Sequence, residues 1–170
     1  MTNYLDASEI EQLLDTMCEQ IRRMYGTELQ DVQMIGLETG GLWIARRLHS
    51  MLALASELGS INIHFYRDDF SRIGLHPKVG PSHVPESLED KQVLLIDDVF
   101  YTGRTVRAAL NEIFDYGRAA EVRLAVLIDR GGHELPIQPD IVGQIIELPT
   151  GRQVKLTGPE PLALKMLETA

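Results

Sequence analysis

The sequence predicts an α/β protein in which a mainly parallel central sheet is flanked by helices on both faces. Short apolar runs typical of buried strands alternate with segments whose apolar residues recur every three or four positions, as they do in helices. Polar or glycine-rich clusters follow four of the apolar runs, after Leu37, Tyr66, Ile96 and Ile128. Because ligands of parallel sheets bind at the carboxyl ends of the strands, we expect these clusters to form one site.

The first third of the chain predicts two helices and a strand. Residues 6–24 have the apolar spacing of an amphipathic helix, and Ser8 and Glu11 have the spacing of a capping box at its start. Residues 32–37 form an apolar run that predicts a buried strand. A second helical pattern covers residues 42–58 and ends at a glycine.

The middle of the chain predicts two strands separated by a long loop. Residues 61–66 alternate and are rich in branched and aromatic side chains, which indicates a strand. Residues 67–91 contain three prolines and little periodicity, which is typical of a lid or a binding loop. Residues 93–96 predict a buried strand that ends at Asp97 and Asp98, before a helix over about 104–116.

The last third of the chain predicts two strands and a short helix. The strands cover residues 121–128 and 141–148, and the helix covers residues 161–168. The chain contains no internal repeat and no low-complexity segment. We therefore expect one domain over residues 1–170.

The composition is that of an ordinary globular protein, with 44% hydrophobic and 24% charged residues among 170. The formal net charge of −9 disfavours indiscriminate binding to nucleic acid or to anionic membranes. Cys18 is the only cysteine, which excludes an intramolecular disulfide and fits a reducing compartment. With no signal-peptide pattern and no apolar run near the length of about 20 residues that spans a bilayer, a cytoplasmic location is expected.

The segment 93–105, VLLIDDVFYTGRT, predicts an anion site at the start of a helix. A helix start offers backbone N–H groups and the positive end of a dipole, and Gly103 allows the backbone to approach an anion closely. Thr102 and Thr105 could add hydroxyl donors, and Arg104 a cation. The loop is not a P-loop, because the GxxxxGK[ST] pattern is missing.

Two carboxylates beside a phosphate site are electrostatically awkward unless the ligand also offers donors or positive charge. A ribose does both, because its hydroxyls can donate to Asp97 and Asp98 and its anomeric carbon becomes oxocarbenium-like during group transfer. The alternative is that this pair only ends a strand as a solvated turn. The thirteen-residue context favours the ribose interpretation.

This segment resembles the fingerprint of type I phosphoribosyltransferases, which bind 5-phosphoribosyl 1-pyrophosphate (PRPP). More narrowly, DDVFYTGRTVRAAL, with FYRDD upstream and LAVLIDRGGHELPI downstream, is similar to the pyrimidine operon regulators that are also uracil phosphoribosyltransferases, the PyrR family. The similarity runs in the same order from Leu5 to the region of Val154. It implies the type I phosphoribosyltransferase fold, with a mobile loop at about 67–91 and a small hood with the final strands at about 130–156.

The resemblance also implies the site residues. Asp97 and Asp98 match the acids that hold the ribose hydroxyls, and Arg67 matches a residue that could contact pyrophosphate when the mobile loop closes. Residues 38–41 match the pyrophosphate loop, residues 101–105 the 5-phosphate loop and residues 129–131 the base-side loop. The implied substrate contacts are Glu38, Thr39, Gly40, Gly41, Val99, Phe100, Tyr101, Thr102, Gly103, Arg104, Thr105, Asp129, Arg130, Gly131 and Val154.

The implied reaction converts uracil and PRPP to UMP and pyrophosphate, with Mg²⁺ carried mainly by PRPP and no compact protein cage of metal ligands. The pyrophosphate loop departs from the family pattern. The family commonly has Lys-Thr-Arg-Gly at this loop, and this chain has Glu-Thr-Gly-Gly at residues 38–41. Two positive charges are absent and one negative charge is gained, a change that bears on PRPP affinity.

Two alternatives remain open at this point. The chain could be a regulator that senses UMP or UTP and binds leader RNA, which the resemblance supports and the acidic composition disfavours. Arg22-Arg23 and Arg46-Arg47 are the best basic pairs for such a role. The chain could also be a phosphoribosyltransferase for another base, such as a purine or orotate. Relatives often form homo-oligomers, so we expect one here.

Overall fold

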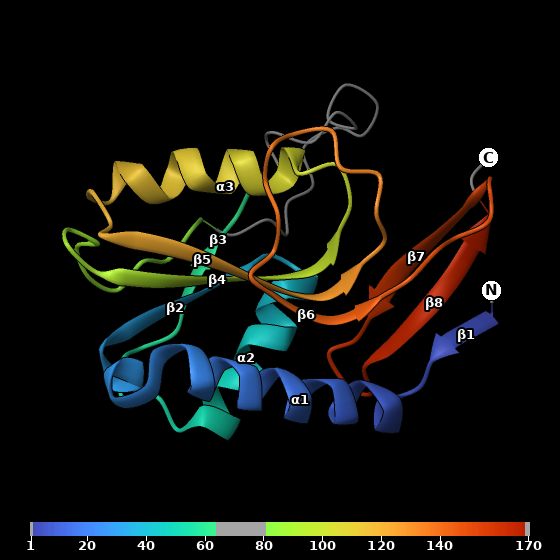
Figure 1. Cartoon of the computed structure of the whole chain (residues 1–170), viewed down its shortest axis with the longest axis horizontal. Helices are drawn as coiled ribbons and strands as arrows, with labels where there is room; N and C mark the ends of the chain where they lie inside the picture. The colour runs from blue at the N-terminus through green and yellow to red at the C-terminus, as the bar shows by residue number, and fades with distance from the viewer. Residues whose placement is uncertain (1, 64–80, 169–170) are drawn as a thin grey trace.

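The computed structural model describes residues 2–63 and 81–168 and contains two sheets (Figure 1). In the described part of the chain the elements, in order, are β1 (Thr2–Leu5), α1 (Ala7–Tyr25), a 3-10 helix (Gly26–Asp31), β2 (Val32–Leu37), α2 (Gly40–Leu52), β3 (Gly59–Ile61), β4 (Gln92–Phe100), α3 (Arg104–Asp115), β5 (Glu121–Asp129), β6 (Ile141–Ile145), β7 (Arg152–Thr157) and β8 (Ala163–Glu168). Within these ranges no helix is both long enough and apolar enough to cross a membrane.

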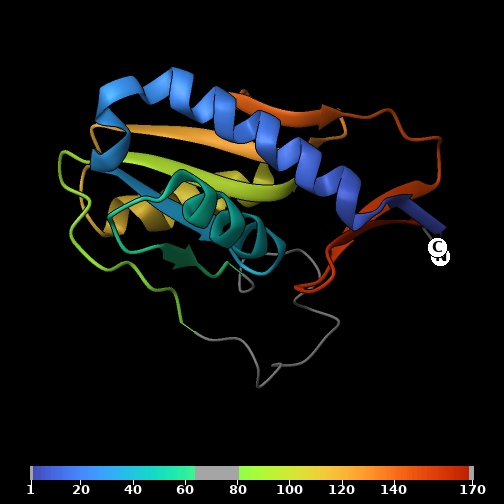
Figure 2. The ribbon, with the colours of Figure 1, turned by 90° about the horizontal axis from the view of Figure 1, so that it is seen from below.

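The larger sheet has the strand order β3-β2-β4-β5-β6, and every neighbouring pair in it is parallel. Helices α1 and α2 lie on one face of this sheet and α3 on the other, as the two perpendicular views show (Figures 1 and 2). The predicted α/β fold class is therefore confirmed. Because the strands are parallel, the segments that follow β2, β4 and β5 meet at the same edge.

The sheet separates two apolar cores, as expected when helices cover both faces. Side chains of α1 and α2 pack against one face, and fully buried members there include Ile10, Leu14, Ile21, Ile44 and Leu48. Side chains of α3 pack against the other face together with Leu95, Phe100 and Val126. Central strand β4 supplies both cores, since Leu94 and Ile96 face one and Val93 and Leu95 face the other.

The second, smaller sheet is antiparallel, has the order β1-β8-β7 and joins the two ends of the chain. In Figure 1 it lies beyond the end of the larger sheet toward which β4, β5 and β6 run. The prediction of a helix over residues 161–168 was wrong. Residues 163–168 form β8 instead, because their backbone pairs with β1 on one side and β7 on the other.

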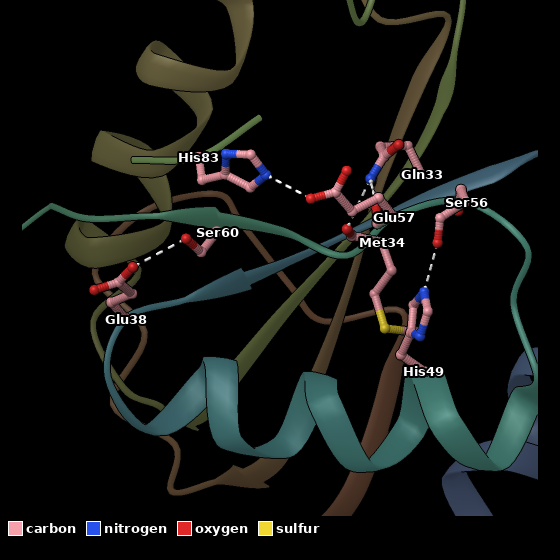
Figure 3. A network of polar contacts seen from close by, with 8 residues as sticks. All are labelled: Gln33, Met34, Glu38, His49, Ser56, Glu57, Ser60 and His83. Atoms are coloured by element: carbon pink, nitrogen blue, oxygen red, sulfur yellow. Dashed lines mark hydrogen bonds and ion pairs between the residues drawn. The ribbon is translucent and has the colours of Figure 1, made fainter. Parts of the chain in front are cut away.

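Two helix boundaries also differ from the prediction. The capping box of α1 is made by Asp6 and Glu9, whose backbone N–H groups and side chains bond reciprocally at 2.8 and 2.9 Å, and not by Ser8 and Glu11. Helix α2 ends at Leu52, six residues before the predicted end. Ala53 turns into the left-handed conformation, and the returning chain is held where the ring Nε2 of His49 donates to the Ser56 carbonyl at 2.6 Å (Figure 3).

The predicted strands match the observed ones closely in the centre of the sheet and less well at its edge. Strand β4 continues past the predicted end, so that both acids of the Asp97-Asp98 pair lie within it. Strand β3 covers only Gly59–Ile61, and the end of the predicted 61–66 strand lies outside the described residues. So does the larger part of the predicted 67–91 loop, with Arg67; in the described remainder, His83 bridges to Ser60.

Candidate phosphoribosyl site

The paired acids lie at the carboxyl end of the central strand β4. Asp97 is 5% exposed and Asp98 is half-buried, and the backbone N–H of Asp98 donates to Asp97 Oδ1 at 2.9 Å. This placement follows from the sequence, because four apolar residues bury the strand up to this point. The carboxylates are therefore fixed to a largely buried central strand, and a site on such a strand is held more precisely than one on a loop.

The loop after β2 lies directly against these acids. A Cβ atom built on Gly40 would overlap Asp98 Oδ2, and one built on Gly41 would lie 2.6 Å from the carbonyl oxygen of Ile96. Only glycine leaves room for this close approach of α2 to β4. The structure thus brings the sequence-predicted residues 40, 41 and 98 together.

Glu38, at the start of the same loop, is turned toward β3. Its backbone N–H donates to the Ile61 carbonyl at 2.9 Å, and its Oε1 accepts a hydrogen bond from Ser60 Oγ at 2.9 Å (Figure 3). The Glu38–Thr39 peptide bond is cis, and Thr39 is exposed. Ser60 is a residue that sequence reasoning missed, since nothing near it in the chain indicates a contact with residue 38.

The loop between β4 and α3 offers an amide-rich helix start. Gly103 has φ +91° and is the N-cap of α3, so the N-cap residue has no side chain that could accept from the first backbone N–H groups of the helix. The Arg104 N–H points to Thr102 Oγ1 at 3.3 Å, and Thr105 is half-buried. An anion that accepts from these N–H groups would also meet the positive end of the α3 dipole.

The side chains of the loop contribute unequally. Tyr101 is 46% exposed, whereas Phe100 is 1% exposed and packs in the core beneath α3. Val99 is half-buried and packs against the core on the opposite face. The Phe100 ring is therefore enclosed by the core, and the substrate contact predicted for this residue stays a prediction. Arg104 is not an isolated cation, because it forms an ion pair with Glu134 at 2.8 Å.

The segment after β5 folds back over this loop. The Arg130 N–H donates to the Phe100 carbonyl at 3.1 Å, and its guanidinium carbon lies 4.0 Å from the centre of the Tyr101 ring. Asp129 is 8% exposed and its Oδ1 accepts from the Gly131 N–H and contacts His133 Nε2, both at 2.9 Å. The base-side loop and the phosphate-side loop are thus fastened to each other.

Val154 comes from a different part of the fold, although its strand contacts β4. It is in β7 of the small sheet, is 8% exposed, and belongs to the core on the α1 side of the larger sheet. Its contact with a base stays a prediction, as does the role of Arg67, which lies outside the described residues. The sequence analysis also missed Glu134, whose link to Arg104 spans 30 positions in the chain.

The donor set suits a cation that brings most of its own ligands. In residues 2–63 and 81–168, no group of three or more His, Cys, Asp or Glu side chains gathers as it would around a metal ion. Asp97 and Asp98 are two oxygen-bearing side chains beside the glycine loop, and Mg²⁺ prefers one or two carboxylates together with ligand oxygens and water. The residues present therefore fit a Mg²⁺ ion that arrives with a phosphate ligand.

Comparisons with known proteins agree with this geometry. The model of the phosphoribosyl transferase domain matches residues 1–159. The chain belongs to this family. Among its relatives are proteins named bifunctional protein PyrR from Nitrosococcus oceani, 57% identical over 83% of this chain and 81% of the relative, and from Pseudomonas paraeruginosa, 46% identical over 91% of both chains. The chain is accordingly a PyrR-type member of the phosphoribosyltransferases.

Solved structures share the fold at low sequence identity. A hypoxanthine-guanine phosphoribosyltransferase from Bacillus anthracis superposes with a TM-score of 0.69 at 16% identity, over 86% of this chain and 84% of that one. A purine phosphoribosyltransferase from Pyrococcus horikoshii gives 0.62 at 25% identity, over 82% and 84%. The predicted phosphoribosyltransferase fold is confirmed, and the protein is a transferase by family.

Proposed function

We propose that the chain is a uracil phosphoribosyltransferase that joins uracil to PRPP and releases pyrophosphate, giving UMP. The observation that carries the proposal is the contact between the Asp98 carboxylate and the Gly40 backbone, at the strand end from which the loop to α3 begins. A ribose bound at these acids would lie between the loop at residues 38–41 and the loop at residues 101–105. The resemblance of the segments 97–110 and 124–137 to pyrimidine operon regulators, and the PyrR relatives, support uracil as the base.

In the proposed mechanism, a ring nitrogen of uracil attacks the anomeric carbon, the bond from that carbon to pyrophosphate breaks, and the nitrogen passes its proton to water or to the released pyrophosphate. Asp97 and Asp98 would accept hydrogen bonds from the ribose hydroxyls and stabilise the positive charge that develops on the sugar. The N–H groups of residues 102–105 would hold the 5-phosphate. Residues 39–41 would receive the leaving pyrophosphate.

The remaining assignments belong to the same proposal. Residues 129–131 would contact the base, with Val154 as an apolar neighbour, and Arg67 would contact pyrophosphate when its loop closes and excludes water. Mg²⁺, held by the Asp98 and Asp97 carboxylates and by oxygens of the ligand, would neutralise charge on the pyrophosphate. A cytoplasmic location and a homo-oligomeric assembly are also proposed.

The test is a panel of bases offered with PRPP and Mg²⁺ to the purified protein, with pyrophosphate release as the readout. We expect release with uracil and little with hypoxanthine, guanine or orotate. Pyrophosphate release with a purine alone would mean that the protein is a phosphoribosyltransferase but that uracil is not its base. Absence of release with every base, in a protein that still binds UMP, would favour a nucleotide sensor without turnover.

A second function, nucleotide-dependent binding of leader RNA, is favoured by the word bifunctional in the names of the relatives. The described arginines of α1 and α2 give it limited support. Arg23 pairs with Glu19, Arg47 pairs with two carboxylates, and Arg22 donates to the Met51 carbonyl at 3.0 Å. Binding to a uridine-rich hairpin at low salt, measured with and without UMP, would test this function. Failure to bind in both conditions would remove it.

A further inference from the structure

The cation of the phosphate loop is engaged by a carboxylate from another loop. Arg104 is the first residue of α3, and its Nε and Nη2 both donate to Glu134 Oε2, at 3.0 and 2.8 Å. The two side chains are 60% and 50% exposed, so the pair lies at the solvent rim of the loop rather than in the core. The charge that the sequence offers to a phosphate is thus already neutralised within the protein.

The backbone holds this carboxylate in place. The N–H groups of Glu134 and Leu135 both donate to the Thr102 carbonyl, at 3.0 and 3.3 Å. The Leu135 side chain also lies 3.5 Å from where a Cβ on Gly103 would be. The backbone of Glu134 is therefore attached to the same turn whose N–H groups face a 5-phosphate in the proposed function, and this attachment keeps its side chain within reach of Arg104.

The electrostatic consequence is a weaker attraction for phosphate. A phosphate at the start of α3 is attracted by Arg104 and repelled by Glu134, and it must share the guanidinium with a carboxylate that already uses two of its donors. Because both side chains are half exposed, salt and water screen these interactions. A change of charge at residue 134 should therefore alter phosphate affinity by a modest factor.

We propose that Glu134 is a specificity-determining residue that competes with the ligand's 5-phosphate for Arg104. The competition lowers the part of the binding affinity that comes from the charge of the phosphate. Tight binding therefore requires the ribose and base contacts as well. Because the competition acts on every ligand that places a phosphate at this site, it reduces the preference of the site for UMP over uridine. The inference rests on the 5-phosphate site of the proposed function and names a residue that controls the phosphate affinity of that site.

The test compares the Glu134→Gln variant with the unmodified chain by calorimetric titration with UMP, ribose 5-phosphate and uridine. Glutamine keeps the backbone bonds to Thr102 and removes only the charge. We expect about two- to fivefold tighter binding of UMP and ribose 5-phosphate, no change for uridine, and a smaller gain at high salt. Glu28→Gln is the matched control, because Glu28 bonds to Gln92 at the opposite end of β4.

The same titrations in an Arg104→Gln background show whether the effect passes through Arg104. We expect most of the gain from Glu134→Gln to be lost there, leaving only the smaller part that comes from direct repulsion between Glu134 and the phosphate. A gain of equal size in the Arg104→Gln background would mean that Glu134 acts by general charge repulsion. Unchanged or weaker UMP binding by the Glu134→Gln variant would mean that the carboxylate does not compete. Either result overturns the proposal. Titration with ribose 5-phosphate separates this proposal from the proposed uracil reaction. If the Glu134→Gln variant binds ribose 5-phosphate more tightly but the protein does not turn over uracil, the competition for Arg104 stands and the uracil reaction is refuted.

Discussion

Polar residues have different surroundings at the amino ends and at the carboxyl ends of the central strands. At the amino ends, polar side chains bond to one another: Gln92 donates to Glu28 at 2.7 Å, and Arg123 pairs with Glu121 and with Asp140. Asp140 also accepts from the Leu124 N–H at 2.8 Å. These polar side chains use one another as hydrogen-bond and ion-pair partners, so this end of the sheet serves stability.

At the carboxyl ends, polar groups are combined with glycines and with an uncapped helix start. Asp98 faces the Gly40 backbone, and the N-cap residue of α3, Gly103, has no side chain to bond the first N–H groups of the helix. Glycine at these places contributes no packing and favours the unfolded chain, which is reasonable only where a close approach is needed. The contrast indicates that this end is arranged for a ligand at some expense of stability, as is common for functional sites.

The largest effect should come from removing both charges of the acid pair. We expect Asp97→Asn together with Asp98→Asn to lower kcat/KM for uracil and PRPP by about 100-fold or more, because the lost carboxylates face the charge that develops in the transition state. Steady-state kinetics would measure this. Asp140→Asn, a similar change at the amino ends, should lower the free energy of unfolding and leave turnover intact. Unimpaired turnover in the double variant would refute the assigned roles.

A smaller effect should come from filling the space between the two loops. Gly40→Ala places a methyl group against Asp98 Oδ2 and should displace the carboxylate, lowering turnover by about 10- to 100-fold. The matched control is Gly26→Ala, whose Cβ meets nothing within 4 Å but sits at φ +53°. That change should lower the free energy of unfolding by about 1 kcal/mol without altering turnover. Equal turnover in the two variants would contradict the close approach.

The smallest effect is expected at the amino-end side, on stability alone. Among residues 2–63 and 81–168, no group forms a hydrogen bond with the buried Tyr25 hydroxyl. Burial, with Glu121 nearby, raises the pKa of Tyr25 above its usual value of 10.0. Tyr25→Phe should raise the free energy of unfolding by up to about 1 kcal/mol. The raised pKa of Tyr25 stabilises the fold below pH 10, and this contribution is lost as the pH rises further. Chemical denaturation at pH 8 and above pH 10 should therefore show that the variant loses less free energy of unfolding between the two pH values than the unmodified chain does. Destabilisation by Tyr25→Phe would point to a partner for the hydroxyl.

The sequence predicted the elements whose signal is local. Strands β2 and β5 and helices α1 and α3 were predicted to within a residue or two, because long apolar runs or helical periods define them. The segment 97–105 indicated the anion site for the same reason, since strand, acids, glycine and helix start follow one another in the chain.

The sequence did not predict what depends on distant partners. Residues 163–168, ALKMLE, are good helix formers, and only pairing with β1 from the other end of the chain makes them a strand. The contacts of Glu134 with Arg104 and of Ser60 with Glu38 likewise join residues more than 20 positions apart. Two nearby sequences fit a capping box, and the exit of the chain from β1 at Leu5 selects the one at Asp6.

The crystal structure of the complex with UMP and Mg²⁺ tests the central claim most directly. We expect phosphate oxygens about 3 Å from the backbone nitrogens of residues 102–105, and ribose hydroxyls within hydrogen-bond distance of Asp97 or Asp98. A nucleotide bound with its phosphate away from the start of α3, or with its ribose out of reach of both acids, would contradict it.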